Sequence, residues 1–204
     1  MTRIAVYGTA LVTFTAATAM TIAANLVPRW VVYAVPPTPG SGAQPFWQTL
    51  GLHRSCSSEA VPSCRPFPQT SRDCSAGAGQ QYFCSVWRSV GFMMALALVV
   101  ELAALVGFVV VMAGGRLKRE SGWRVLGLLL AAAALLHVFA GATVAFLRDR
   151  DDRFLVPGWR LDISWIFCIA SATIAFLCAA GLALSALVLP PEDGYEFLRD
   201  PVES

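Results

Sequence analysis

Four long apolar segments constrain the fold of this chain more than any other feature of its sequence. They cover residues 4–27, 91–113, 125–147 and 163–189. A helix needs roughly 20 mainly apolar residues to cross a bilayer core about 30 Å thick, and each segment meets that length. Only 14% of the residues are charged and 56% are hydrophobic, whereas a soluble domain carries about 25% charged residues. We therefore predict an integral membrane protein.

The predicted fold is an all-α membrane bundle of four transmembrane helices. In a bilayer every span must satisfy its own backbone hydrogen bonds, which excludes an open sheet in the hydrocarbon region. The spans form one domain over residues 1–189, followed by an acidic tail over 190–204. Ala17, Thr18 and Ala19 resemble the cleavage site of a secretory signal, which is the alternative for the first span. Its apolar stretch is longer than a signal core of about 7–15 residues, so we expect a retained span.

The charges of the loops predict the orientation of the bundle. Residues 114–124 contain four basic residues and one acidic residue, and short basic loops stay in the cytosol. Both termini then lie in the cytosol, and the loops 28–90 and 148–162 are exoplasmic. Loop 148–162 has four Arg and four Asp, so it adds no bias. We interpret its first part, 148–153, as a solvated run with internal ion pairs; the alternative is a site for a partner, a wall polymer or a cation.

The exoplasmic loop 28–90 contains four cysteines, and the oxidising side of a membrane favours disulfides. Four cysteines allow three pairings, between which the sequence alone does not choose. We favour pairing in sequence order, because it closes the two shortest loops: Cys56–Cys64 and Cys74–Cys84. A β-rich run at 30–35 precedes Pro and Gly residues at 36–42 that are typical of turns. We expect a small sheet, stapled by the disulfides, outside the membrane.

The composition and the motifs point away from several function classes. The net charge of +2 is spread along the chain, so we predict no nucleic-acid partner. The loop cysteines lack the close spacing of structural zinc ligands, and no Cys-x-x-Cys pair serves thiol redox catalysis. The sequence has no phosphate loop, no dinucleotide fingerprint and no serine–histidine–acid set. We therefore expect no enzyme, no catalytic, cofactor or metal site, no small-molecule substrate, and inert thiols at Cys168 and Cys178.

Two ionisable residues lie deep inside the predicted spans. Glu101 is the only acidic residue well inside a span, and His137 is the only histidine there. Both lie roughly 18–20 Å from the cytosolic ends of their spans at about 1.5 Å per residue, so we expect similar depths. An ionisable group inside a membrane is a candidate functional site because its burial is costly. A hydrogen-bonded Glu101–His137 pair would relay protons or sense pH; the alternative is a neutral Glu101 that ties two spans together.

The long loop resembles that of the claudin superfamily of four-span membrane proteins. The likeness is carried by a Trp after the first span, a Gly-Leu box before two cysteines, and an Arg at the start of the second span: Trp30, Gly51, Leu52, Cys56, Cys64 and Arg88. Within the superfamily the chain is most similar to claudin-like proteins of filamentous fungi, related to the PalI and eisosome types. His53 stands where the family has a Trp, and Cys74 and Cys84 are additional.

The resemblance implies a left-handed four-helix bundle capped by a small antiparallel exoplasmic sheet. It also implies non-catalytic work in the plasma membrane, where the exoplasmic loop organises membrane domains or contacts at the cell surface and the cell wall. The partners would be membrane lipids and other membrane proteins, or further copies of the chain. Residues 201–204 lack the Tyr-Val ending by which claudins recruit scaffolds. The alternative function is an accessory subunit of a transporter, channel or pH-sensing complex that uses Glu101 and His137.

Overall fold

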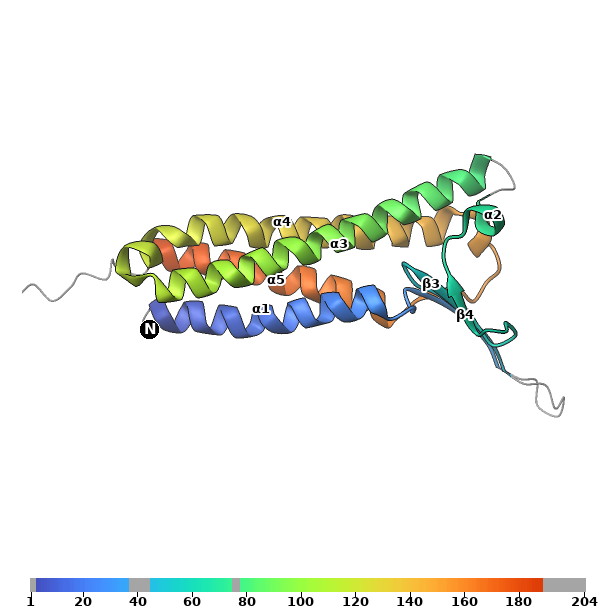
Figure 1. Ribbon diagram of the computed structural model, residues 1–204, viewed down its shortest axis with the longest axis horizontal. Helices are drawn as coiled ribbons and strands as arrows, with labels where there is room; N and C mark the ends of the chain where they lie inside the picture. The colour runs from blue at the N-terminus through green and yellow to red at the C-terminus, as the bar shows by residue number, and fades with distance from the viewer. Residues whose placement is uncertain (1–2, 37–44, 75–77, 189–204) are drawn as a thin grey trace, which may run out of the picture.

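The protein consists of a bundle of four long helices with a small sheet at one end (Figure 1). A computed structural model describes residues 3–36, 45–74 and 78–188; most of the predicted turn at 36–42 and the acidic tail 190–204 lie outside these residues. The elements in chain order are α1 Arg3–Leu26, β1 Val31–Val35, β2 Phe46–Leu50, β3 Arg54–Ser57, β4 Cys64–Pro66, α2 Thr70–Asp73, α3 Ala78–Ala113, α4 Gly115–Arg150, the 3-10 helix η1 Asp152–Phe154, β5 Arg160–Leu161 and α5 Ile163–Val188.

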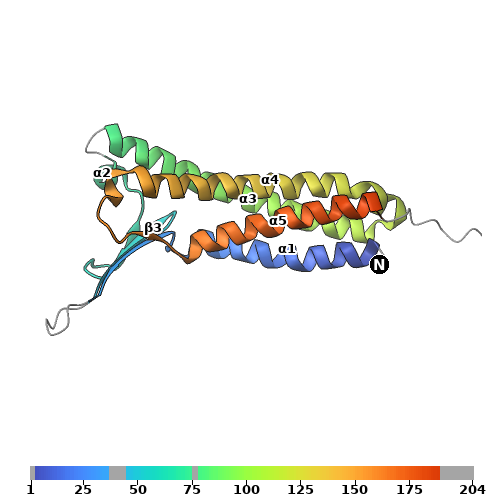
Figure 2. The same ribbon diagram turned by 180° about the vertical axis from the view of Figure 1, so that it is seen from behind.

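The four long helices confirm the predicted membrane bundle. Each of α1, α3, α4 and α5 is long and apolar enough to cross a membrane. In the bundle α1 packs against α3 and α5, and α4 packs against the same two helices. The start of α1 and the end of α5 lie at the same end of the bundle, opposite the sheet (Figure 2). An even number of spans produces this arrangement.

Two helices continue beyond the predicted spans. Helix α3 begins at Ala78, well before the predicted start of the second span at residue 91. Helix α4 begins at Gly115, so the predicted loop 114–124 is a single-residue break followed by helix. The segment is rich in Arg, Lys, Leu and Glu, which are good helix formers in water as well as in lipid. The change of solvent at the membrane surface therefore does not end these helices.

The sheet has five antiparallel strands in the order β4-β3-β2-β1-β5. Strands β1 and β2 pair from Val31 opposite Leu50 to Val35 opposite Phe46. The two-residue strand β5 comes from the loop before α5 and pairs with Val31 and Val32. Both loops at this end of the bundle therefore contribute to one sheet. We call residues 28–36, 45–74, 78–90 and 151–162 together the cap.

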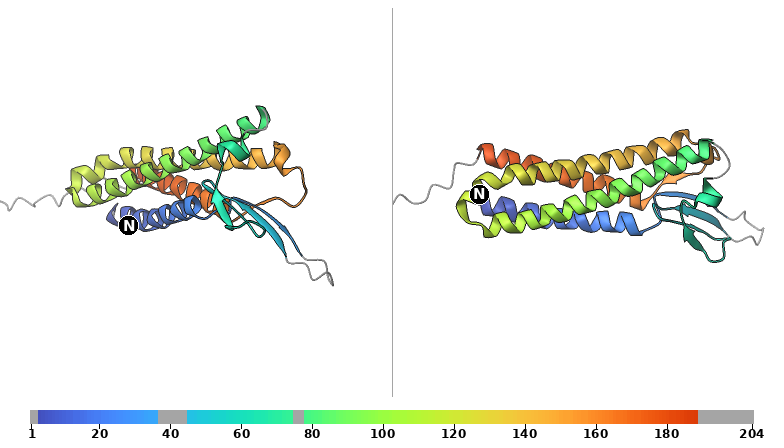
Figure 3. Two further views of the ribbon diagram at one scale, coloured as in Figure 1. Left: turned by 45° about the vertical axis from the view of Figure 1, so that its right-hand side comes forward. Right: turned by 45° about the horizontal axis from the view of Figure 1, so that its top comes forward.

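The cap and the bundle share one apolar core at their junction. Trp30 and Trp87 are fully buried there, beside Met94 on the membrane part of α3. A second apolar cluster fills the end of the bundle away from the cap. The sheet itself leans away from the bundle axis on the side of α1 (Figures 1 and 3). One face of the sheet thus packs on the junction, and the other looks away from it.

Candidate functional site

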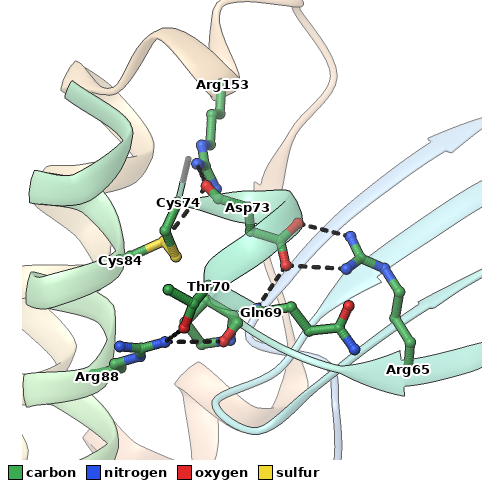
Figure 4. Close-up of a disulfide and its surroundings, with 9 residues drawn as sticks. Arg65, Gln69, Thr70, Asp73, Cys74, Cys84, Arg88 and Arg153 are labelled. Atoms are coloured by element: carbon green, nitrogen blue, oxygen red, sulfur yellow. Dashed lines mark hydrogen bonds and ion pairs between the residues drawn. A yellow bond between two sulfur atoms is a disulfide. The ribbon is translucent and has the colours of Figure 1, made fainter. Parts of the chain in front are cut away.

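The two disulfides of the cap join the cysteines in sequence order, which confirms the favoured pairing. Cys56 and Cys64 bond across β3 and β4, where they are direct partners in the strand register. Cys74 and Cys84 bond the residue after α2 to α3, and both are buried. The first disulfide staples two neighbouring strands. The second fixes α2 onto the long helix that continues into the membrane (Figure 4).

Trp30 and Gly51, two residues of the claudin-like pattern, join the sheet to the helices. The indole of Trp30 donates to the carbonyl of Ala24 on α1 (2.7 Å). Gly51 lies so close to Pro28 that an added Cβ would be 2.4 Å from the Pro28 Cα. The carbonyl of Gly51 also accepts from the indole of Trp87 on α3 (3.1 Å). A side chain at position 51 would therefore separate the sheet from the end of α1.

Leu52 and Arg88 belong to the same junction. Leu52 is buried in its apolar core. The guanidinium of Arg88 donates to the Thr70 hydroxyl (2.8 Å) and the Pro68 carbonyl (3.5 Å), so it ties α3 to the start of α2. His53, at the position of the family's Trp, lies with Arg88 in a shallow pocket beside α3. These contacts give the pattern residues structural roles in the cap.

A partly buried carboxylate organises the outer part of the cap (Figure 4). Asp73 accepts two hydrogen bonds from the guanidinium of Arg65 on β4 (2.8 and 3.0 Å) and one from the Gln69 backbone N–H (2.8 Å). Its backbone carbonyl accepts a hydrogen bond from the guanidinium of Arg153 of η1. The Arg153 guanidinium also lies over the ring of Phe83, 4.2 Å from its centroid. Asp73 thus links β4, α2 and η1 around the Cys74–Cys84 disulfide.

The surroundings of Asp73 favour its ionised form. Burial is the largest single influence and acts against the charge, but the hydrogen bonds from Arg65 and Gln69, with the charges of Arg65 and Arg153, outweigh it. The pKa of Asp73 is therefore lowered from its usual value. The same hydrogen bond raises the pKa of Arg65, whereas burial lowers the pKa of Arg153. This pattern is typical of a structural ion pair.

The charged run 148–153 is only partly the solvated run that the sequence predicts. Arg148 pairs with its neighbour Asp149 at 2.6 Å, and both are exposed. Arg153, however, leaves the run and reaches across to Asp73 and Phe83. No signal in the sequence indicates this long-range contact, because a loop Arg beside three Asp residues has nearer partners.

One polar residue from each long helix meets the other three inside the bundle. They are Thr21 on α1, Glu101 on α3, His137 on α4 and Ser171 on α5, and none has any exposed surface. Along each helix the neighbouring core positions belong to the two apolar clusters, one on the cap side and one on the far side. We call these four residues the polar cluster; it is a single polar layer between two apolar ones.

Glu101 and His137 lie together but do not hydrogen-bond directly. Their nearest atoms, Oε1 and Nε2, are 3.7 Å apart, which is beyond a hydrogen bond. The hydroxyl of Thr21 lies between them, 3.0 Å from Glu101 Oε1 and 2.9 Å from His137 Nε2. Ser171 supports this bridge, with its hydroxyl 2.8 Å from that of Thr21 and 3.1 Å from Glu101 Oε1. The expected direct pair is therefore a pair bridged by a threonine.

Counting hydrogens allows two arrangements in which Thr21 links Glu101 directly to His137. His137 Nδ1 lies 2.7 Å from the Ala133 carbonyl, which only accepts, so Nδ1 carries a proton. With a neutral ring, the Glu101 carboxyl donates to Thr21 and Thr21 donates to Nε2. With a cationic ring, Nε2 donates to Thr21 and Thr21 donates to the Glu101 carboxylate. The two arrangements use the same heavy atoms and differ by the transfer of one proton between Glu101 and His137.

The second carboxyl oxygen of Glu101, Oε2, takes no part in this hydrogen-bond network. Among the buried side-chain nitrogen and oxygen atoms of the described residues, Glu101 Oε2 is the one without a hydrogen-bond partner. An unsatisfied buried oxygen is costly, and more so when it carries charge. This cost favours the neutral arrangement, in which Glu101 keeps its proton.

Sequence reasoning missed Thr21 and Ser171. Both are hydroxyl residues within spans, where such residues satisfy themselves by bonding to the backbone of the same helix, as Thr9, Thr13 and Thr18 do on α1. Only the rotation of α1 and α5 in the bundle distinguishes Thr21 and Ser171 from these. The sequence does not contain that rotation.

The remaining reactive groups are dispersed. Cys168 and Cys178 are buried free thiols on α5, and Cys168 contacts the His137 carbonyl at 3.4 Å. Within residues 3–36, 45–74 and 78–188 no group of three or more His, Cys, Asp or Glu side chains could hold a metal ion. No protein-family model matches the chain, and a comparison with curated proteins finds no match. The cap and the polar cluster therefore carry the functional argument.

Proposed function

We propose that this is a non-catalytic membrane protein of the claudin-like type, which organises plasma-membrane domains or cell-surface and cell-wall contacts through an exoplasmic cap. The observation that carries the proposal is the disulfide-stapled sheet at one end of a four-helix bundle. A small antiparallel sheet at this end is what the resemblance implies, and both loops at that end contribute strands to it. Its partners would be membrane lipids, other membrane proteins or further copies of the chain.

The orientation in this proposal has two independent supports. Disulfides persist on the oxidising side of a membrane, and both of them lie in the cap. The basic residues of 114–124 belong to the opposite end, and positive residues stay in the cytosol. Both observations support a cap on the exoplasmic side and two termini in the cytosol.

The cap also presents apolar side chains for contacts. Leu155 and Val156 follow η1 and are 74% and 54% exposed, although they lie outside the predicted spans. Val61, between β3 and β4, is 100% exposed. Exposed apolar side chains that adjoin one another are typical of surfaces that bind partners. The adjacent pair Leu155 and Val156 is therefore the first place to test for a contact.

Topology is tested first, by labelling intact cells with a membrane-impermeant thiol reagent. We expect Val61→Cys to label from outside and Ser204→Cys to label only after permeabilisation. The reverse pattern would place the cap in the cytosol and refute the proposal. Mass mapping without reduction checks in each variant that both native disulfides remain.

Contact formation is tested by tracking single tagged molecules in the membrane. We expect Leu155→Ser with Val156→Ser to raise the lateral diffusion coefficient, because a contact that slows the protein is lost. Val61→Ser is the control, since it removes a fully exposed apolar side chain elsewhere on the cap. Unchanged diffusion in the double variant, or an equal change in Val61→Ser, would count against a contact at this site.

The polar cluster favours a second candidate function, an accessory subunit of a transporter, channel or pH-sensing complex. The Thr21 bridge allows one proton to pass between Glu101 and His137 without movement of heavy atoms. Thr21 lies about 8 Å from the cap end of α1 at 1.5 Å per residue, so the cap end is the nearer end of this helix. Proton exchange would therefore occur with the cap side.

Infrared spectroscopy of the purified protein tests this candidate. We expect a carbonyl band of a protonated carboxyl group whose intensity changes with pH, and its loss in Glu101→Gln. Thr21→Val should alter the pH dependence because the bridge is removed, whereas Thr18→Val should not. Thr18 is buried on the same helix and bonds only to the Phe14 carbonyl (3.1 Å). A band that is insensitive to pH would leave Glu101 with a structural role alone.

A further inference from the structure

The outward face of the sheet contains a groove of about 420 Å³. Its floor is formed by Val32 and Ala34 of β1 and by Thr49 and Trp47 of β2, which lie opposite them in the register and therefore on the same face. Arg160 lies opposite Val32 on β5 and lines the same groove. A concave, mainly apolar surface with a few polar groups is the usual form of a small-molecule site, and its volume is within the usual range.

The groove lies at the level of the membrane surface. Arg29, at its inner edge, follows the end of α1 by three residues, and Arg160 precedes the start of α5 by three residues. The polar headgroup region occupies only about 5–8 Å on each side of the hydrocarbon core, so both Arg residues lie where lipid phosphates lie. The sheet leans outward over this region on the side of α1 (Figure 3). Trp47, at the rim, is a residue type enriched at membrane interfaces.

The charges of the groove fit a single monoanion. Arg29 is paired with Asp162 at 2.7 Å, and its side chain remains half exposed. Arg160 is exposed and forms no ion pair with any described residue. The two Arg residues and Asp162 therefore leave one net positive charge at the groove. A phosphodiester carries one negative charge, and a planar guanidinium binds phosphate oxygens with two parallel hydrogen bonds.

We propose that this groove binds one membrane phospholipid, with its phosphodiester on Arg160 and Arg29 and its glycerol and first methylene groups against Val32, Ala34 and Trp47. The lipid would approach from the leaflet beside α1, under the outward-leaning sheet. The inference rests on the four-span arrangement and is independent of the contact function proposed above. The proposal gives the cap a ligand-binding role.

Native mass spectrometry of the full chain in a neutral detergent tests the site, with dioleoyl phosphatidylcholine as the probe. We expect one bound lipid, and an affinity lowered at least about tenfold in Arg160→Gln because a charge-assisted hydrogen bond is lost. Trp47→Ala should weaken binding several-fold through lost apolar contact. Arg72→Gln is the matched control, because Arg72 is exposed on α2 away from the groove. Its affinity should equal that of the wild type.

Two further probes separate the sources of the phosphate. Dioleoylglycerol has the same chains without phosphate and should not compete, and glycerophosphocholine has the headgroup without chains and should compete only weakly. Absence of a bound lipid, equal binding of dioleoylglycerol, or equal effects of Arg160→Gln and Arg72→Gln would overturn the site. Full competition by glycerophosphocholine would also overturn it, in favour of a soluble phosphate ester. Non-reducing mass mapping confirms the fold of each variant, and the contact variants at 155 and 156 should bind lipid normally.

Discussion

The cap and the bundle are held together by different side chains, although a single helix, α3, runs through both. The core of the cap contains the buried Trp30 and a chain of large rings that contact one another in pairs: Phe67, Phe83, Trp87, Phe154 and Trp159. The bundle also buries large side chains such as Phe14 and Phe108, but alanine recurs at its buried positions: Ala10, Ala17, Ala24, Ala97, Ala104, Ala133, Ala134, Ala140, Ala172 and Ala175. Packing against small residues brings helices close, as at Gly141, where an added Cβ would be 2.7 Å from the Ile169 Cδ1.

The difference shows how the surrounding solvent selects the means of stabilisation. In water, burial of a large ring is strongly favourable, so a small cap gains most from aromatic side chains and disulfides. In lipid no hydrophobic force drives helices together, so close backbone approach and interhelical hydrogen bonds replace it. The polar cluster is the extreme case, with one hydrogen-bonding residue from each helix. If this comparison is right, equivalent substitutions should cost more in the cap than in the bundle.

The largest effect is expected at the centre of the junction. Trp87→Ala should lower the free energy of unfolding of the cap by about 3–5 kcal/mol, the usual cost of removing a buried Trp or Phe side chain. The change also removes the hydrogen bond to the Gly51 carbonyl. Tyr82→Ala, on the same helix but 60% exposed, should cost less than about 0.5 kcal/mol. Hydrogen exchange of the β1–β3 amides measures the stability of the cap in both variants. Equal exchange in the two variants would contradict a cap held together by its aromatic core.

The disulfides provide the next test. Removing Cys74–Cys84 by double substitution to Ser should destabilise the cap by about 2–4 kcal/mol and release α2 from α3. Removing Cys56–Cys64 should leave its two strands paired by backbone hydrogen bonds. Limited proteolysis should therefore cut near α2 in the first variant earlier than near β4 in the second. Resistance of both variants would mean that the aromatic core alone holds the cap.

The sequence predicts those parts of the molecule that follow from local composition. The four spans, the strand at 30–35 and the pairing of the cysteines could be predicted because apolar length, β-rich runs and short loop closure are local properties. The extension of α3 and α4 beyond their spans could not be predicted. The length of an apolar segment indicates which part of a helix lies in lipid, but it does not indicate where the helix ends. Residues 115–124 are an example. Their basic residues indicate a cytosolic location, but they are compatible with a helix as well as with a loop.

The polar contacts could not be predicted from the sequence, because they depend on how the helices and strands pack against one another. Glu101 and His137 could be placed near one another by depth, but the bridge through Thr21 depends on how α1 is rotated. Asp73 and Arg65 are close in sequence, yet their pairing requires the turn that brings α2 back over β4. In both cases the sequence shows which residues are polar or charged, but it does not show which residues they contact.

The ion pair of Asp73 should matter less than the disulfide beside it, and only above a limiting pH. Because the folded pKa of Asp73 is lowered from its usual value of about 3.9, its contribution is complete above about pH 4 and is lost as pH falls through the folded pKa. Asp73→Asn should cost about 1.5–3 kcal/mol at neutral pH, the range for hydrogen bonds to charged groups, and should flatten the acid limb of the stability curve. Asp149→Asn, in the exposed pair with Arg148, should have almost no effect.

The smallest effect is expected in the bundle, where Thr21→Val removes the bridge of the polar cluster. The substitution keeps the shape of the side chain and leaves Glu101 Oε1 with Ser171 as its remaining partner. The cost should be about 0.6–1.7 kcal/mol, which spans the average and the largest values measured for interhelical hydrogen bonds in a membrane protein. Thr18→Val loses only a hydrogen bond to its own helix and should be neutral. Unfolding in mixed detergent measures the stability of both variants. A cost for Thr21→Val above that of Trp87→Ala would reverse the comparison, because the polar layer would then outweigh the aromatic core, and the cluster would be the structural centre of the molecule.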